Sequence, residues 1–152
     1  VYRKEDGRCL MLKRADWEKV HPGKYCVPGG KLEWSNLPLE NPSRLNDDVL
    51  DYENAVEELL AREVMEEAGL EIDLSNGLRY INSVAFIRPD GIPAVLVKFA
   101  APFKSGSVVL EEGAFTDHVW VNADEVKNFD FIEGIDEEVA QTIRMFQETK
   151  LL

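Results

Sequence analysis

One segment near the middle of the chain restricts both the fold and the chemistry more than any other. Residues 53–68 contain neither glycine nor proline and are rich in alanine, leucine, glutamate and methionine, and Gly69 follows directly. This composition predicts a helix that ends at a glycine, which readily adopts the left-handed conformation of a helix C-terminus. The early turns carry an apolar stripe formed by Val56, Leu59 and Leu60. Three carboxylates continue that stripe at the helical repeat: Glu63, Glu66 and Glu67. We therefore expect the acidic end of the helix to face protein or a cleft.

Three carboxylates on a partly buried helix face need a counter-charge. At about 6 Å and an effective dielectric constant near 20, each pair repels by roughly 3 kcal/mol, against a few tenths on a solvated helix. Arg62 lies one turn before Glu66 and can pair with it, but one arginine cannot neutralise three carboxylates. A divalent cation can, and an oxygen-rich site suits Mg²⁺, with Mn²⁺ as a substitute. The alternative is a solvated acidic face, and helix geometry alone does not decide between the two.

The other segments predict an α+β fold in which a sheet is flanked by helices. Strands are expected at the very start of the chain and then at 8–13, 25–27, 80–86, 94–99 and 118–121. Residues 136 to about 150 are amphipathic and predict a closing helix, with Leu151 as an extension of its apolar side. Residues 34–51 predict a long loop with a helical turn at its end. One domain over residues 1–152 is expected from the length.

Charge and composition exclude several classes of protein. The net charge is −12, and residues 47–73 hold eleven acidic residues against one base, Arg62. A protein that binds duplex nucleic acid needs a basic face, so none is expected here as a partner. No run of 18 apolar residues predicts a membrane span, and no signal peptide is visible. Cys9 and Cys26 match no disulfide framework or metal motif, so we expect buried thiols and a cytoplasmic, reducing location.

The residues of the acidic helix resemble those of a known family. Residues 62–70 read R-E-V-M-E-E-A-G-L and meet every fixed position of R-E-U-x-E-E-x-G-U, the second half of the Nudix box, where U is aliphatic. Upstream, P-G-G-K at 28–31 resembles the loop that opens the box. The resemblance implies a Nudix-type α/β/α sandwich with a mixed β-sheet flanked by helices. It also implies a metal-dependent hydrolase that cleaves a nucleoside diphosphate linked to another moiety.

Two features depart from the family pattern. The chain between the glycine loop and the helix is about 18 residues longer than in the family, and the extra residues fall within 34–51. We expect this insertion to form a wall or lid of the substrate pocket, the alternative being a solvated excursion. In addition, the first glutamate of the family pattern aligns with Asn54, and Glu53 lies one position away.

By resemblance, the glutamates of the helix are the metal ligands. Glu63 and Glu67 are the leading candidates and Glu66 is the next. Either Glu63 or Glu66 is alternatively the base that acts on the attacking water. Arg62 is expected to orient Glu66 through a salt bridge without contacting substrate.

Residues outside the helix are expected to complete the site. The carbonyl of Gly29 is a candidate metal ligand, and a further acid is expected from a loop before a Trp-containing strand. In that loop Glu112 is favoured over its neighbour Glu111. Phosphate contacts are expected from Arg14 and Lys31. Three aromatic side chains could stack on a nucleobase or, alternatively, belong to the core: Trp17, Tyr25 and Trp34.

The substrate class follows by elimination among branches of the family. The ADP-ribose branch has a proline about fifteen residues past the box. This chain has Ala85 there, and the first proline after its box is Pro89. The dinucleoside-polyphosphate branch has a tyrosine near the same position, where this chain reads A-F-I at 85–87, and the S-Q-P-W-P-F-P string of the NADH branch does not occur in the sequence. A nucleoside triphosphate or a small nucleotide derivative is therefore favoured. The alternative is a Nudix-like domain that senses a nucleotide without cleaving it, and a homodimer is left open.

Overall fold

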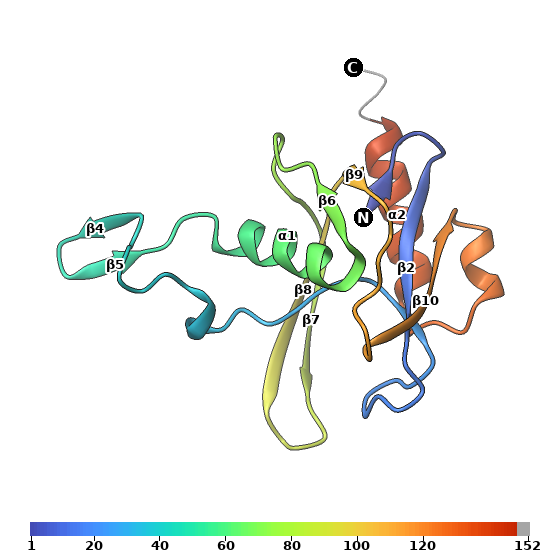
Figure 1. Ribbon diagram of the computed structural model, residues 1–152, viewed down its shortest axis with the longest axis horizontal. Coiled ribbons are helices and arrows are strands. Elements are labelled where there is room, and N and C mark those ends of the chain that lie inside the picture. The colour runs from blue at the N-terminus through green and yellow to red at the C-terminus, as the bar shows by residue number, and fades with distance from the viewer. Residues whose placement is uncertain (149–152) are drawn as a thin grey trace.

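The computed structural model describes residues 1–148 and shows the mixed α+β architecture expected from the sequence (Figure 1). Its α-helices are α1, Ala55–Ala68, and α2, Ile135–Glu148. The short 3-10 helices are η1, Trp34–Asn36, and η2, Glu125–Asn128. The strands are β1 Tyr2–Arg3, β2 Arg8–Arg14, β3 Tyr25–Cys26, β4 Arg44–Asn46, β5 Val49–Asp51, β6 Leu70–Ile72, β7 Arg79–Ile87, β8 Pro93–Ala100, β9 Phe103–Gly106 and β10 Phe115–Val121. None of the helices described is long and apolar enough to cross a bilayer.

The central sheet is built around β2, which pairs antiparallel with β1, β3 and β10. Residues 9–12 of β2 are at most 3% exposed. Because successive side chains of a strand point to opposite faces, burial at consecutive positions means that both faces of β2 are covered. Isolated parallel bridges join Tyr2 to Pro102 and Tyr25 to Phe131, which makes the strand arrangement mixed.

Both helices contribute to one hydrophobic core with this sheet. Val64 and Ala68 of α1 and Val139 and Ile143 of α2 belong to the same buried cluster as β2. The ring of Phe146 on α2 stacks on Tyr2, with centroids 4.8 Å apart. The closing helix is thus confirmed up to Glu148, while the predicted extension to Leu151 lies outside the described residues. The two cysteines are buried free thiols, as expected.

At the C-terminal end of α1, Gly69 and Gly106 allow two backbone segments that are far apart in sequence to lie close together. Gly69 has a φ of 67° and donates its N–H to the Met65 carbonyl at 2.9 Å. A Cβ on Gly106 would lie 2.8 Å from the Gly69 carbonyl oxygen. This close approach allows β6, which follows the helix, to pair with β9. The sequence predicted neither strand because each is short and gains its partner from 30 or more residues away.

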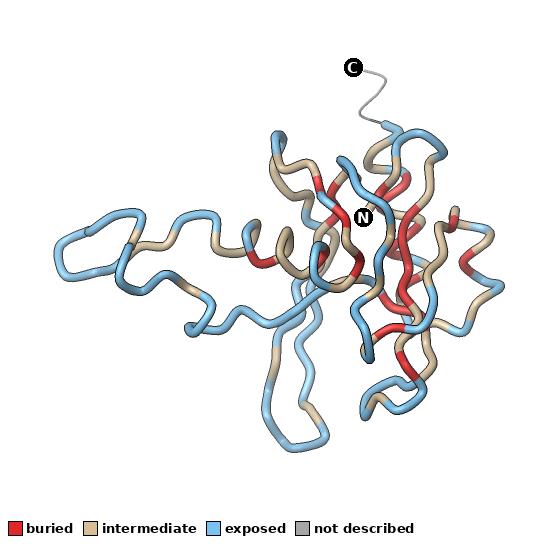
Figure 2. Tube along the Cα trace, viewed as in Figure 1, coloured by how far each residue is buried: buried red, intermediate tan, exposed pale blue. Residues whose placement is uncertain are grey.

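The hairpin of β7 and β8 projects from the body of the protein, as Figures 1 and 2 show. Its predicted strands at 80–86 and 94–99 are confirmed, each longer by one residue at both ends. Apolar side chains toward its tip are exposed, including Ile87 at 75% and Val95 at 70%. This part of the sheet has few tertiary neighbours.

Residues 34–51 form a second projection, which we call the arm (Figure 1). The prediction of a loop with a helical turn at its end is wrong on two counts. The helical turn, η1, lies at the start of the arm, and its end is the hairpin of β4 and β5. Local contacts hold this hairpin, notably an ion pair of 2.8 Å between Arg44 and Asp51. Figure 2 shows the arm as largely exposed.

Candidate active site

The three glutamates of α1 differ in burial according to their angle from the packed face. The buried residues of α1 are Leu59, Val64 and Ala68. Viewed down the helix axis, Glu67 projects closest to the direction of Val64 and Ala68. Glu63 is next, and Glu66 projects farthest from it. Glu63 and Glu67 are accordingly half-buried, whereas Glu66 is exposed. The carboxylates therefore form the edge of the packed face and not its continuation.

The glycine loop contacts two of these glutamates directly. The N–H of Gly29 donates to Glu67 Oε2 at 2.9 Å. A Cβ on Gly30 would overlap the Glu63 carboxylate, so only glycine leaves that carboxylate in place. Gly29 therefore contacts the cluster through its N–H. The predicted role of its carbonyl as a metal ligand stays a prediction.

The acidic loop before β10 reaches the site through Glu111. The N–H of Glu111 donates to the Glu67 carbonyl at 3.2 Å, and the charge of Glu111 acts on both Glu63 and Glu67. Ala114 and Phe115 donate their N–H groups back to the Glu111 carbonyl, each at 3.3 Å, which turns this residue toward the helix. Both Glu111 and Glu112 are exposed, but only Glu111 is among the charges that act on Glu63 and Glu67, so Glu111 is the nearer of the two acids; the predicted role of Glu112 as a metal ligand stays a prediction.

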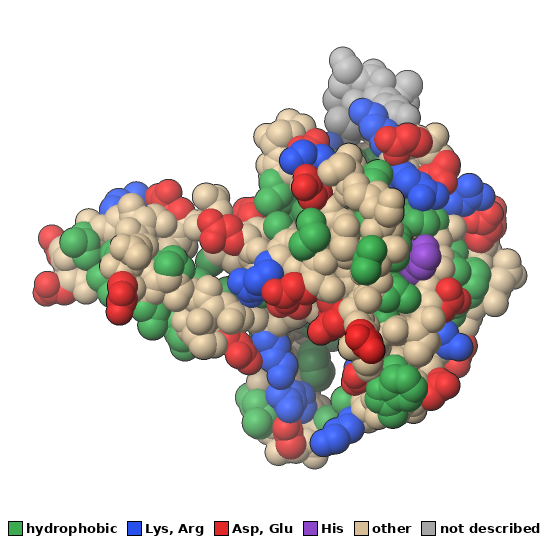
Figure 3. All heavy atoms as spheres, in the orientation of Figure 1, with side chains coloured by type: hydrophobic (Ala, Val, Ile, Leu, Met, Phe, Trp, Pro, Cys, Tyr) green, Lys and Arg blue, Asp and Glu red, His purple; other side chains and the backbone are tan. Residues whose placement is uncertain are grey.

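The surroundings of Glu63 and Glu67 disfavour the ionised form of both carboxyl groups. Burial raises the pKa of Glu67 to about 7, with further increases from Glu63 and Glu111, against the lowering effects of the Gly29 N–H and Arg14. Burial also raises the pKa of Glu63, as do the charges of Glu66 and Glu111. Desolvation and like charges both disfavour the ionised form, so the site stabilises added positive charge. Figure 3 shows acidic side chains gathered over the C-terminal half of α1.

The donor set fits a divalent cation in charge and in chemistry. Carboxylate oxygens are the ligands that Mg²⁺ prefers, and Glu63, Glu66, Glu67 and Glu111 supply them here. Within residues 1–148, however, no three His, Cys, Asp or Glu side chains converge closely enough to surround an ion. One oxygen of Glu67 is engaged by Gly29 instead. For these carboxylates to surround an ion together, the glutamate side chains must adopt other rotamers.

Arg62 does not pair with Glu66 as predicted. Its Nη2 lies 3.8 Å from Oε1 of Glu63 and is buried without a hydrogen-bond partner. An arginine placed N-terminal to a glutamate at i, i+4 has the weaker of the two orientations for an ion pair, which favours the alternative neighbour. The contact predicted between Arg62 and Glu66 is thus made with Glu63 instead, and a positioning role for Arg62 stays a prediction.

The structure brings Arg14 close to the cluster but leaves Lys31 and Trp34 at the surface. Arg14 acts electrostatically on Glu67, while its guanidinium also donates to Glu18 and to the Val20 carbonyl, both at 2.8 Å. Lys31 is exposed directly after the glycine loop. Trp34 is 76% exposed on the first turn of the arm.

Asn54 and Glu53, the residues near the family's first glutamate position, are not among the groups that act on Glu63 and Glu67. Asn54 adopts a left-handed conformation with φ of 57° immediately before α1. Glu53 is exposed and lies 3.6 Å from Arg44 in the arm. The departure from the family pattern therefore belongs to the junction with the arm.

Comparison with known proteins decides the family. A family model described as the NUDIX domain matches residues 1–143. The chain belongs to the Nudix family. As a Nudix-type hydrolase, it acts on pyrophosphate bonds, and the predicted family and mixed α+β fold are thereby confirmed.

Relatives of this Nudix hydrolase include a curated enzyme and several solved structures. Nucleoside triphosphatase NudI from Klebsiella pneumoniae is 27% identical over 132 residues, which cover 82% of this chain and 80% of NudI. The crystal structure of a MutT protein from Methanosarcina mazei superposes with a TM-score of 0.61 at 18% identity, over 98% of this chain and 88% of that one. The NUDIX domain of Shewanella oneidensis NrtR, complexed with ADP ribose, gives 0.59 at 14% identity over 94% and 77%.

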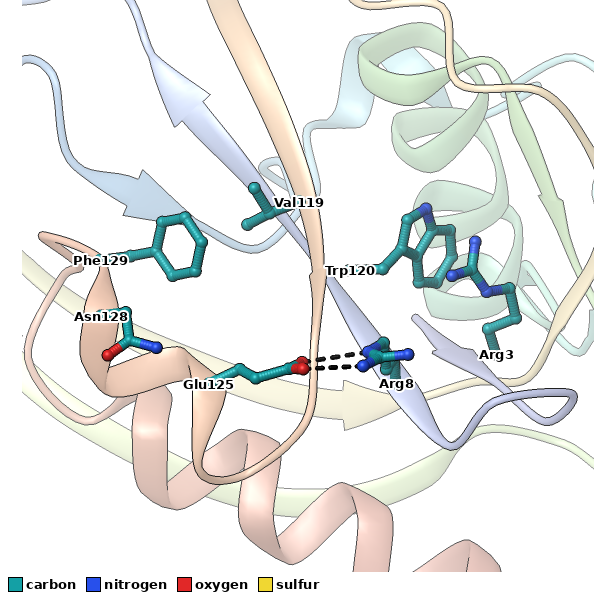
Figure 4. Close-up of a pocket in the computed structure, with 7 residues that line it drawn as sticks. All are labelled: Arg3, Arg8, Val119, Trp120, Glu125, Asn128 and Phe129. Atoms are coloured by element: carbon teal, nitrogen blue, oxygen red, sulfur yellow. Dashed lines mark hydrogen bonds and ion pairs between the residues drawn. The ribbon is translucent and has the colours of Figure 1, made fainter.

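A hollow elsewhere on this Nudix domain is not a rival site. It has a volume of about 380 Å³ and lies beside β10 and η2 (Figure 4). Both of its arginines are engaged: Arg8 donates twice to Glu125, and Arg3 pairs with Asp6 and lies over the Trp120 ring at 4.1 Å. The hollow therefore offers little uncompensated charge to a nucleotide.

Proposed function

We propose that this Nudix hydrolase cleaves the diphosphate linkage of a small nucleotide with the help of a divalent cation at the acidic end of α1. The observation that carries the proposal is the convergence of the glycine loop, α1 and the acidic loop on Glu63 and Glu67. Gly29 bonds to one of these glutamates, Gly30 makes room for the other, and the charge of Glu111 acts on both.

The residues of the cluster have different roles in this proposal, and these roles follow from their burial. Glu63 and Glu67, half-buried, hold Mg²⁺, or Mn²⁺ in its place, with Glu66 and Glu111 at the margin. The cation, when bound, neutralises the phosphate oxygens and orients them for attack by water. Glu66 is exposed and therefore well placed to accept a proton from that water. Arg62 restrains Glu63 from the side, and the Gly29 N–H holds Glu67 against the loop.

A nucleoside triphosphate is the favoured substrate, with small nucleotide derivatives as the wider class. Similarity to the nucleoside triphosphatase NudI supports this choice. So do the missing sequence marks of the ADP-ribose, dinucleoside-polyphosphate and NADH branches. Two reduced, buried cysteines agree with the reducing, cytoplasmic location that we expect.

A panel assay tests the proposal. The full chain is incubated with each of the eight common ribo- and deoxyribonucleoside triphosphates, with ADP-ribose and with a dinucleoside tetraphosphate, with and without Mg²⁺. We expect Mg²⁺-dependent release of pyrophosphate or phosphate, fastest with a nucleoside triphosphate. Turnover without divalent cation would contradict the metal assignment. Binding of nucleotide without any turnover would instead establish the sensing domain left open by the sequence.

A further inference from the structure

Trp17 is a large aromatic side chain that lies outside the hydrophobic core. It lies in the loop between β2 and β3 and is 70% exposed. Its indole N–H donates to the Gly113 carbonyl at 2.8 Å. Because the polar atom of the ring is already bound, the exposed apolar face remains available to a ligand.

Hydrogen bonds tie the Trp17 loop to the acidic loop of the site. The N–H of Ala15 donates to the Ala114 carbonyl at 2.9 Å, next to the bond between Trp17 and Gly113. Gly113 lies two residues after Glu111, a separation of about 7 Å at most. Glu111 in turn is bonded to the backbone of Glu67. The indole nitrogen thus lies at most roughly 15 Å from the backbone carbonyl of Glu67, at the acidic end of α1.

The same loop is ordered from its other side by Arg14. The guanidinium of Arg14 donates to the Val20 carbonyl and to Glu18, both at 2.8 Å, and this closes the loop around Trp17. The position of the ring is therefore set before a ligand arrives. A pre-positioned ring loses little conformational freedom on binding, which favours its use as a contact surface.

We propose that Trp17 stacks on the nucleobase of the substrate while the phosphates lie at the carboxylate end of α1. This inference rests on the proposed function and adds to it a side chain that determines affinity for the base. Tyr25, by contrast, is buried and donates its hydroxyl to Asp117. Trp34 is exposed, but in the described part of the chain its indole N–H makes no hydrogen bond to either loop of the site.

Three variants of the full chain test the inference with the best triphosphate of the panel. Trp17→Ala removes the ring, Trp17→Phe keeps an aromatic face but loses the bond to Gly113, and Phe86→Ala removes an exposed ring of the β7–β8 hairpin as a control. We expect Trp17→Ala to raise KM about tenfold with kcat within twofold. Trp17→Phe should stay within threefold of the wild-type KM, and Phe86→Ala should match it.

A binding measurement needs no turnover and separates this inference from the proposed function. With Mg²⁺ present, a non-hydrolysable analogue of the same triphosphate should quench the intrinsic tryptophan fluorescence of the wild type, and Trp17→Phe should lose most of that quench. An unchanged KM in Trp17→Ala, or an equal quench in Trp17→Phe, would overturn the stacking role. A tenfold rise in KM for both variants would overturn it as well, because it would assign the effect to the Gly113 bond. Absence of hydrolysis by the wild type would contradict only the proposed function.

Discussion

Strand β2 and the β4–β5 hairpin of the arm are both β-structure, yet different forces hold them. Residues 9–12 of β2 are at most 3% exposed, and the strand has paired neighbours on both edges. In the arm, Leu45 is 67% and Val49 is 57% exposed, and its two strands pair only with each other. A two-stranded hairpin alone is marginally stable in water, whereas a strand covered on both faces gains from every buried side chain.

The difference in burial indicates that the two regions contribute differently to function. The body around β2 fixes α1, the glycine loop and the acidic loop to one another, and the proposed chemistry requires that rigidity. The arm enters next to the glycine loop and leaves at the start of α1, but contributes little to the core. We expect substitutions in the body to affect turnover or folding and substitutions in the arm to affect substrate affinity.

The largest effect is expected from Glu67→Gln at the acidic end of α1. It should lower kcat about 1,000-fold or more, equivalent to about 4 kcal/mol, while the fold stays intact. Without metal, the melting temperature should hold or rise because a half-buried charge is removed. The stabilisation gained on addition of Mg²⁺ should shrink. Wild-type turnover at saturating Mg²⁺ would show that Glu67 is not a ligand.

The same variant should reveal the titration of Glu67. The pKa of this carboxyl is raised from its ordinary 4.5 to about 7 in the folded protein. Folding therefore favours the protonated form, and the wild type loses stability as the pH rises from about 4.5 to about 7. In melting curves without metal, Glu67→Gln should gain on the wild type across this interval and keep a constant advantage above it. A constant difference at all pH values would contradict the raised pKa.

A matched pair of leucines compares the two regions directly. Leu10 of β2 is fully buried, and Leu50 of the arm is 49% exposed. Leu10→Ala should lower the free energy of unfolding by about 3 kcal/mol, because it loses buried surface and leaves a cavity. Leu50→Ala should change it by less than about 0.5 kcal/mol. Denaturant titration measures both, and equal losses would mean that the arm is part of the core.

Gly30→Ala tests whether the glycine loop shapes the site. The added Cβ would displace the Glu63 carboxylate, which lies at the end of a flexible side chain, so the fold should remain. We expect kcat to fall about thirtyfold, or about 2 kcal/mol, with little change in melting temperature. Gly91→Ala, far from the site, is a control for kcat alone: no atom lies near its new Cβ, but the φ of 83° at Gly91 strains an alanine and should lower the melting temperature without changing turnover. Normal turnover in Gly30→Ala would separate the loop from the chemistry.

Replacement of residues 35–50 by a short Gly-Ser bridge should have the smallest effect. We expect KM to rise, or the preference among triphosphates to change, by about tenfold, or about 1.4 kcal/mol. The Mg²⁺ dependence and the free energy of unfolding should stay close to those of the full chain. Unchanged kinetics on every triphosphate would leave the arm without a role in the substrate pocket. A large loss of stability would contradict the contrast drawn from its exposure.

The features that the sequence determined are those set by local chemistry. Helix α1 could be predicted because its residues favour helix and Gly69 supplies the left-handed end, and its carboxylates followed from the helical repeat. The glycines at 29 and 30 signalled a tight loop for the same reason. Helix α2 and most strands were visible in the apolar pattern, since periodicity along the chain is itself a local property.

Only the tertiary structure decided which side chains meet at the site. The effect of the Glu111 charge on Glu63 and Glu67, the contact of Arg62 with Glu63 and the burial of Glu67 depend on how separate segments pack against α1. The pairing of β6 with β9 and the indole bond of Trp17 to Gly113 likewise join residues far apart in sequence. Such contacts gain their stability from burial that exists only after the chain has folded, so no local pattern could encode them in advance.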